Sequence, residues 1–402
     1  PVVSAELEGD SNSYYELEDV FGIGDDTEEE QLAALNLAET LNEAAVTGTS
    51  GGIDWSYEGG VLTISAAKEP ESGYDKGWMK DYTNQSNETV GIPTPWYSVK
   101  DEITKVVIQN DVTYLGNWAF SYLTNAKKAN IPASITDLGD HIFRGDTNLT
   151  TVKWADGFKA PTTITDTDSN GGSYTGTYVP TSMFDGCVSL GNNEELSDWL
   201  PSSFTGVGCA AFRGTQFTVN FDAWSNLNYI GAYAFSEMPN LDSFTLTDKI
   251  TIGLRGTASN AFTKSGLKSL TVDVETVPES FANSANELAK IVLTDSVKIV
   301  GKSAFQGTAI TELVVPSGVE KLAAWSFLNC SSLKKLTLLG KITLEGVQFP
   351  GTSLEELVIG KDAVVTCTDD PFRGTGNYLA MTSLKKVSIL GTFTSSSTDG
   401  DT

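Results

Sequence analysis

Residues 310–327 read Ile-Thr-Glu-Leu-Val-Val-Pro-Ser-Gly-Val-Glu-Lys-Leu-Ala-Ala-Trp-Ser-Phe, and variants of this segment recur along the chain. The segment has apolar side chains at Ile310, Leu313 and Val315 and ends on Phe327. A unit of this length cannot bury its apolar side chains alone. Stacked units can, because each apolar side chain then lies over its counterpart in the next turn. The repetition therefore predicts a solenoid.

Phenylalanine marks the period of the repeat. Six of the ten gaps between successive marker phenylalanines lie within one residue of 23. The residue before the marker, F−1, is usually small, F−4 is often glycine, and F−2 varies. In the unit of Phe281 we expect Ser280 at F−1 and Glu279 at F−2. The markers are Phe120, Phe143, Phe184, Phe212, Phe235, Phe262, Phe281, Phe305, Phe327, Phe349 and Phe372.

A second pattern, apolar-x-x-apolar-x-apolar, precedes most of the markers. Its last two apolar positions alternate with polar ones, which predicts a half-buried strand, and the first packs beneath them. The copies are Ile103-Val106-Ile108, Leu149-Val152-Trp154, Leu241-Phe244-Leu246, Leu267-Leu270-Val272, Leu288-Ile291-Leu293, Ile310-Leu313-Val315, Leu333-Leu336-Leu338, Leu354-Leu357-Ile359 and Leu384-Val387-Ile389.

The unit resembles the BspA-type leucine-rich repeat of bacterial surface and secreted proteins, which reads roughly L-x-x-I-x-I-P-x-x-V-x-x-I-G-x-x-A-F. Residues 126–143 and 310–327 match it well, and the resemblance extends over roughly residues 53–390. It implies a mainly β, right-handed leucine-rich-repeat solenoid of about eleven turns with an N-terminal helix and β cap. It also implies export from a bacterium and action by binding, and it brings no catalytic residues.

Five parts follow along the chain. We expect an acidic N-terminal arm at 1–26, a helix at 27–50, an N-terminal β cap at 51–102, the repeats at 103–390 and a polar tail at 391–402. Insertions at 155–183 and 186–206 break the period. The helix is predicted from a capping box, Thr27 with Glu30. In the cap, two apolar runs around Gly59 and Gly60 predict a β-hairpin.

The chain is strongly acidic, with a net charge of −26, and its first 67 residues hold fifteen acids and no Lys or Arg. This charge disfavours nucleic acid and anionic membrane surfaces as partners. No apolar run reaches the roughly 18 residues of a spanning helix, so we expect no membrane insertion. Because the chain begins at Pro1, we expect export through a removed leader and leave open whether the native chain continues past Thr402.

Metal and cofactor chemistry finds little support in the sequence. Four cysteines without C-x-x-C spacing and one histidine argue against zinc and against a disulfide scaffold, and Cys187 and Cys330 are expected to be buried thiols. Residues 206–211 match G-x-G-x-x-A, but Gly208 also fits the F−4 position of the repeat. Residues 166–171 match half of a calcium loop through Asp166, Asp168 and Asn170; a plain turn is the alternative.

Ligand binding is predicted at F−2 positions of the repeat. Trp118, Tyr233 and Trp325 are candidate aromatic anchors, with packing against a neighbouring turn as the alternative. His141, also at F−2, is expected on the surface, and any histidine-based catalysis would have to use it. We predict no catalytic, metal or cofactor-binding residues.

The function predicted from the sequence is non-enzymatic binding. We expect an exported bacterial repeat protein, extracellular or at the cell surface, that adheres to a host or community protein or glycan. The alternative is a structural spacer that displays another domain or assembles with itself. A glycan-active enzyme with a pair of carboxylates is a remote third possibility.

Overall fold

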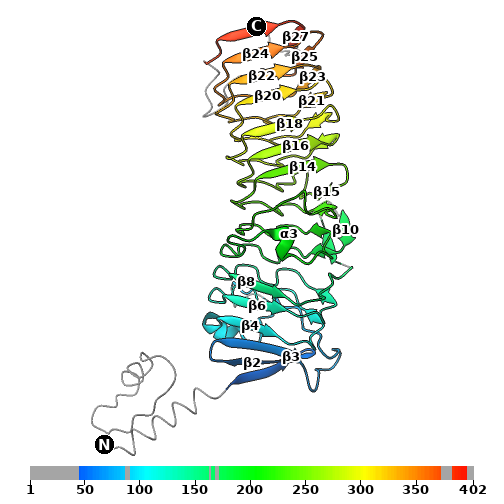
Figure 1. Ribbon diagram of the computed structural model, residues 1–402, viewed down its shortest axis with the longest axis vertical. Helices are drawn as coiled ribbons and strands as arrows, with labels where there is room; N and C mark the ends of the chain where they lie inside the picture. Colours follow the sequence, from blue (N-terminus) through cyan, green and yellow to red (C-terminus); the bar gives the residue numbers. More distant parts are fainter. Residues whose placement is uncertain (1–44, 87–90, 163, 168–171, 373–382, 396–402) are drawn as a thin grey trace, which may run out of the picture.

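The chain is a mainly β solenoid of about eleven turns with few helices. The computed structural model describes residues 45–86, 91–162, 164–167, 172–372 and 383–395. The turns stack along one long axis, from the blue strands β2 and β3 to the red strand β27 (Figure 1). Two short helices occur in the described part, the 3-10 helix η1 (Tyr97–Glu102) and the single-turn helix α3 (Leu196–Trp199). No described helix is both long and apolar enough to cross a membrane.

One face of the solenoid consists of strands of four or five residues. Each strand alternates exposed or half-buried with buried side chains in most turns, and most neighbours pair in parallel; Leu336, for example, lies between Leu313 and Leu357. These strands are β4 (Lys105–Ile108), β6 (Lys128–Ile131), β8 (Thr151–Trp154), β14 (Ser243–Thr247), β16 (Ser269–Asp273), β18 (Lys290–Leu293), β20 (Glu312–Val315), β22 (Lys335–Leu338), β24 (Glu356–Ile359) and β26 (Lys386–Ile389). All nine strands predicted from the apolar pattern are confirmed.

A second face consists mostly of two-residue strands, also parallel. They are β5 (Tyr114–Leu115), β7 (Asp137–Leu138), β11 (Tyr178–Val179), β12 (Gly206–Val207), β13 (Tyr229–Ile230), β15 (Thr251–Ile252), β17 (Thr276–Val277), β19 (Ile299–Val300), β21 (Lys321–Leu322), β23 (Lys341–Leu344), β25 (Val364–Cys367) and β27 (Thr392–Ser395). The residue after the short strand, at F−4, is often glycine, because the backbone of the neighbouring turn lies too close for a Cβ atom. A Cβ added at Gly231 would lie 2.5 Å from Cys209 N.

The marker phenylalanines form the core of the corner that follows each short strand. Their rings stack from turn to turn, with centroids 5.5 Å apart for Phe120 and Phe143 and 5.7 Å apart for Phe143 and Phe184. The unit of Phe281 departs from the predicted register. There Ala282 donates its N–H to the next turn as a marker phenylalanine does, and Ser280, not Glu279, occupies F−2 with φ 55°. The predicted register was wrong by one residue. In this unit Ala282 occupies the marker position of the backbone, and Phe281 occupies F−1.

Three antiparallel strands stand at the N-terminal end of the described chain. They are β1 (Val46–Ser50), β2 (Ile53–Glu58) and β3 (Val61–Ala66), and β3 then pairs in parallel with β4. The predicted hairpin is confirmed. The helix predicted at 27–50 is wrong over residues 46–50, because these pair with β2 as a strand. Residues 27–44 and the arm at 1–26 lie outside the described residues.

The polar tail predicted at 391–402 contains a strand. Strand β27 pairs in parallel with β25, so the solenoid extends through residue 395. Residues 396–402 lie outside the described part. On the other face, Val387 and Ile389 of β26 are 50% and 55% exposed, because β26 pairs with β24 alone among the described strands.

The two insertions lie near the middle of the solenoid. The first contains an antiparallel hairpin of β9 (Ile164–Thr167) and β10 (Ser173–Gly176). The second contains α3, whose Trp199 packs edge-on against the rings of Phe184 and Phe212. In the first, the ring of Tyr174 lies 4.9 Å from that of Tyr229, so both insertions rest on the repeats.

Candidate functional site

The four predicted binding residues share one backbone conformation. Trp118, His141, Tyr233 and Trp325 have φ angles of 59°, 61°, 60° and 63°. This left-handed region disfavours side chains larger than that of glycine by about 1–2 kcal/mol. Hydrogen bonds between turns hold the conformation, as when Trp118 N donates to Asp140 O at 2.9 Å. The F−2 position is thus fixed by the backbone, whichever side chain it carries.

Trp118 and His141 come together from successive turns. Their rings are 4.0 Å apart and nearly parallel, at 10°, and the guanidinium of Arg144 lies 5.3 Å from the Trp118 ring. His141 is half-buried, so it is less exposed than the expected surface histidine, because the Trp118 ring covers part of it. Burial, with the positive charges of Arg144 and Arg255, lowers the pKa of His141 to about 4. His141 is therefore neutral at pH 7.

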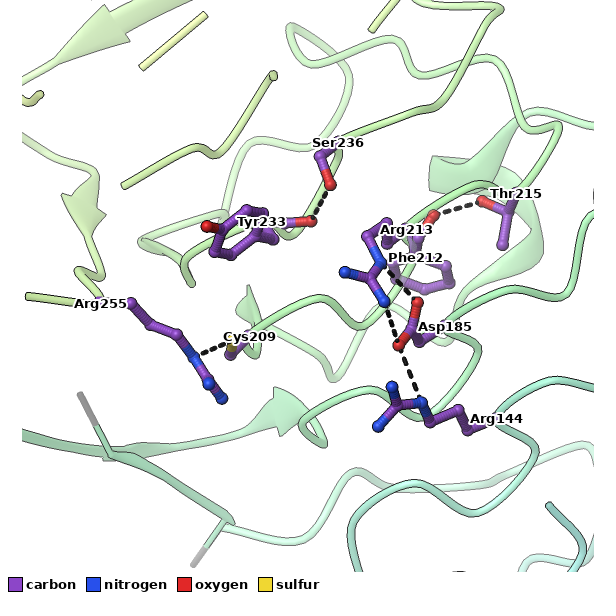
Figure 2. Close-up of polar contacts among 9 residues, drawn as sticks. All are labelled: Arg144, Asp185, Cys209, Phe212, Arg213, Thr215, Tyr233, Ser236 and Arg255. Atoms are coloured by element: carbon purple, nitrogen blue, oxygen red, sulfur yellow. Dashed lines mark hydrogen bonds and ion pairs between the residues drawn. The ribbon is translucent and has the colours of Figure 1, made fainter. Parts of the chain in front are cut away.

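A second set of side chains occupies F+1 in three successive units. Arg144, Asp185 and Arg213 each follow a marker phenylalanine and form an alternating row (Figure 2). Asp185, 3% exposed, accepts from Arg213 Nε at 2.7 Å and Nη2 at 2.9 Å, and lies 3.1 Å from Arg144 Nε. The buried carboxylate holds both guanidinium groups in place while their outer edges meet solvent.

Arg255 extends this surface toward Tyr233. Its Nε donates to Cys209 Sγ at 3.3 Å, and Figure 2 shows Arg255 and Arg213 to the two sides of Cys209, with Tyr233 near both. Cys209 is buried beside Ala210, Ala232 and Tyr233. Burial raises the pKa of the Cys209 thiol, so it is neutral at pH 7. We call Trp118, His141, Arg144, Arg213, Tyr233 and Arg255 together the central arginine face.

Asp166 is buried near this surface, and both of its carboxylate oxygens accept hydrogen bonds. Its Oδ1 accepts from Thr181 Oγ1 at 2.9 Å, and its Oδ2 accepts from Cys209 N at 2.9 Å and Tyr229 OH at 2.7 Å. The side chain thus ties the first insertion to the repeats. Asp168 and Asn170 of the candidate calcium loop lie outside the described residues. Among the described ones, no three His, Cys, Asp or Glu side chains are arranged to hold a metal.

Asp140 lies beside a small cavity next to the central arginine face. The cavity has a volume of about 180 Å³ and is lined by Tyr114, Asn117, Asp137, Asp140 and neighbouring backbone. Burial, and then the negative charge of Asp166, raise the pKa of Asp140 to about 7. The side chain consequently changes its charge near neutral pH.

Trp325 stands apart from the other three predicted residues. It is 41% exposed and lies 4.6 Å from Lys302 Nζ, in a cation–π contact. Between Tyr233 and Trp325 the F−2 position holds Asn260, Ser280 and Ser303. The structure therefore brings Trp118 and His141 together, places Tyr233 beside Arg255, and leaves Trp325 several turns away.

A family model described as a BspA type leucine rich repeat region matches the chain in six copies, over residues 91–166, 173–281 and 255–379. The chain belongs to the BspA-type leucine-rich repeat family. No curated protein gives a significant match to it. The resemblance expected from the sequence is thus confirmed.

Solved structures of bacterial leucine-rich repeat proteins are similar at low identity. One from Bacteroides ovatus has a TM-score of 0.44 and 17% identity, over 77% of this chain and 94% of that one. One from Eubacterium ventriosum has a TM-score of 0.46 and 19% identity, over 86% and 85%. A leucine rich cell surface protein from Faecalibacterium prausnitzii has a TM-score of 0.37 and 16% identity, over 87% and 96%.

Sequence reasoning missed the arginines of this BspA-type chain. The sequence contains four. Arg144 and Arg213 share Asp185, and Arg144 and Arg255 both lower the pKa of His141; Arg373 lies outside the described residues. Two features of the sequence could have indicated them. Arginine is scarce in this chain, and Arg144 and Arg213 both follow a marker phenylalanine. Arg255 lies outside the repeat motif, and only the folded chain reveals its place.

The remaining motifs are parts of the repeat. Gly206 begins the two-residue strand β12, and the turn after Gly208 leads into the Phe212 corner, so the glycine pattern is that of the repeat and not of a nucleotide site. All four cysteines are buried. Cys187 Sγ donates to Phe143 O at 3.0 Å and Cys330 Sγ to Phe305 O at 3.3 Å, in each case the marker of the previous turn.

Proposed function

We propose that this chain is a non-enzymatic binding module of an exported bacterial protein. It acts at the cell surface or outside the cell, by adhesion to an extracellular protein or glycan. The observation that carries the proposal is the set of aromatic and arginine side chains that turns in the first half of the solenoid hold at F−2 and F+1, namely Trp118, Tyr233, Arg144 and Arg213. Tryptophan, tyrosine and arginine are the residue types that contribute most at binding surfaces. Membership of a repeat family supports the same conclusion, because stacked turns provide extended surfaces for binding.

A structural spacer is the second candidate. It is favoured by the last long strand, β26, where Val387, Ile389 and the following Leu390 are at least half exposed. Such an apolar end could join the solenoid to further repeats or to another copy. A glycan-active enzyme is the third and remote candidate, for which the carboxyl of Asp140 beside its small cavity is the relevant feature.

Two structural parts belong to the proposal. The solenoid winds to the right, as the repeat family implies, and residues 51–102 cap its N-terminal end. The antiparallel strands β1 to β3 support the capping role, because they close the parallel sheet with a hairpin. Deletion of residues 45–102 should therefore expose the apolar rung of β4 and cause aggregation, measured by size-exclusion chromatography.

A binding screen tests the function. The purified chain is assayed at physiological salt against extracellular-matrix proteins, mucins and glycans, each with and without calcium. Saturable binding that Trp118→Ala or Trp325→Ala abolishes supports the binding module and locates its face. A calcium requirement would assign a metal to the loop at 166–171. A negative result across the panel would favour the spacer.

A further inference from the structure

We propose that the central arginine face binds the terminal acidic sugar of a glycan, through the carboxylate or sulfate group of that sugar. This inference rests on the proposed binding function and names its ligand class. It starts from the distribution of arginine. The chain has 52 acidic residues and only four arginines. Arg144 and Arg213 share Asp185, and Arg144 and Arg255 both lower the pKa of His141, so three of the four lie in one region of the solenoid.

The guanidinium groups retain unused donors. Arg144 bonds Asp185 through Nε, and Arg255 bonds Cys209 through Nε, so the terminal nitrogens of both have no partner among the described residues. Arg213 uses Nε and Nη2, which leaves Nη1. A guanidinium presents five N–H donors in a plane that matches a carboxylate or a sulfate. The unused edges are therefore suited to an anionic group.

These donors are held in place before any ligand arrives. Asp185 fixes Arg144 and Arg213 from the buried side, and the Trp118 ring packs under Arg144 at 5.3 Å. Arg255 is anchored by the buried Cys209 thiol. Fixed side chains lose less conformational entropy on binding, which favours affinity for a small ligand. Surface lysines with free side chains lack this advantage.

The neighbouring groups favour a sugar over a bare anion. The charges of Asp185, Asp166 and Glu237 near the arginines offset much of their positive potential. A sugar acid can use both signs, since its anionic group accepts from guanidinium donors and its hydroxyls can donate to the exposed carboxylate of Glu237 near Arg213. The Trp118–His141 stack and Tyr233 add apolar ring surface, against which the carbon face of a sugar ring can pack.

Charge also argues for a single terminal sugar and against a long polyanion. The chain carries a net charge of −26, so a polymer of acidic units would be repelled wherever it left the central arginine face. Screening at physiological salt acts over about 8 Å, so a lone terminal group experiences mainly the local arginines. The chemistry therefore fits one acidic sugar at the end of an otherwise neutral glycan.

The test uses the full chain and isothermal titration calorimetry. The probes are 3′-sialyllactose, lactose 3′-sulfate, unmodified lactose, inorganic sulfate and a tetraglutamate peptide. We expect one or both acidic sugars to bind, and lactose and sulfate to bind at least about tenfold more weakly. The two acidic sugars distinguish a carboxylate from a sulfate. Arg255→Gln should weaken binding by about tenfold or more, and Arg255→Lys by less, because lysine lacks the planar fork.

Lys302→Gln is the matched control. Lys302 pairs with the exposed Trp325 at another F−2 position, so its loss should leave the affinity unchanged. Arg144→Gln is a second variant, since Arg213 still holds Asp185; circular dichroism checks its fold.

Four results would overturn the inference: no binding of either acidic sugar, equal binding of lactose, binding of tetraglutamate alone, or equal losses in Arg255→Gln and Lys302→Gln. A partner from the broader screen that Arg255→Gln leaves bound would refute this inference and keep the proposed function. No binding in either experiment would refute both.

Discussion

Neutralising Asp140 should stabilise the protein, but only above the pH at which this residue ionises. Burial and the nearby Asp166 raise the pKa of Asp140 from its usual 3.8 to about 7. The native state therefore holds the Asp140 proton more tightly than the unfolded state does. Stability contributed by that proton is complete below about pH 4 and is lost as the pH rises through about 7. Above that range the folded chain carries an unfavourable buried charge.

The size of the effect follows from the pKa. A change from 3.8 to about 7 corresponds to about 4 kcal/mol of unfolding free energy, before screening by water is counted. Asp140 is partly exposed, so solvent reduces this, and we expect Asp140→Asn to gain about 1–2 kcal/mol at pH 8. The variant resembles the protonated side chain, so at pH 4 it should match the wild type.

Urea unfolding followed by circular dichroism, at pH 4 and pH 8, measures the difference. Asp156→Asn is the control, because it removes one exposed negative charge from the same acidic chain and reports the general relief of repulsion. A gain confined to high pH and absent from the control would support the reasoning. Equal gains at both pH values, or a loss at pH 8, would refute it.

Three further substitutions test the packing of the turns, with unfolding free energy as the common measurement. Gly231→Ala should cost about 2 kcal/mol or more, because its Cβ would meet backbone at 2.5 Å, and a neutral result would contradict the close approach. Phe212→Ala should cost about 3–5 kcal/mol through loss of a fully buried ring, whereas Trp325→Ala should cost under about 1 kcal/mol. Asp185→Asn should cost about 2–4 kcal/mol, since two arginines lose a buried partner; no change would show that the ion pairs are incidental.

The sequence predicts the fold well wherever one local pattern repeats. Apolar alternation locates the strands, because every turn must bury the same positions, and all nine predicted strands form. The unit of Phe281 shows the limit of this reasoning. There the backbone places Ala282 at the marker position, and a shift of one residue between turns leaves no trace in the spacing of phenylalanines.

The candidate site could be predicted only in part, for a different physical reason. Trp118 and His141 share a repeat position, so their stacking follows from the period once the turns are adjacent. Arg213 shares F+1 with Arg144, but Arg255 lies outside the repeat motif, where the spacing says nothing about which side chains meet. The half-burial of His141 could not be predicted from its own position either, because it depends on the Trp118 ring in the previous turn.

The left-handed positions explain how a regular solenoid can carry an irregular surface. Hydrogen bonds between turns determine the backbone at F−2, so residues as different as Trp118, Ser182 and Ala210 adopt nearly the same φ, from 53° to 59°. A change of side chain there alters the surface without altering the stacking of turns. At F+1 the same holds for the partly exposed Arg144 but not for Asp185, whose buried carboxylate pairs with two arginines. Binding specificity can therefore reside mainly at F−2 while the phenylalanine core maintains the fold, which is why substitutions at F−2 should separate ligand binding from stability more cleanly than substitutions of the markers.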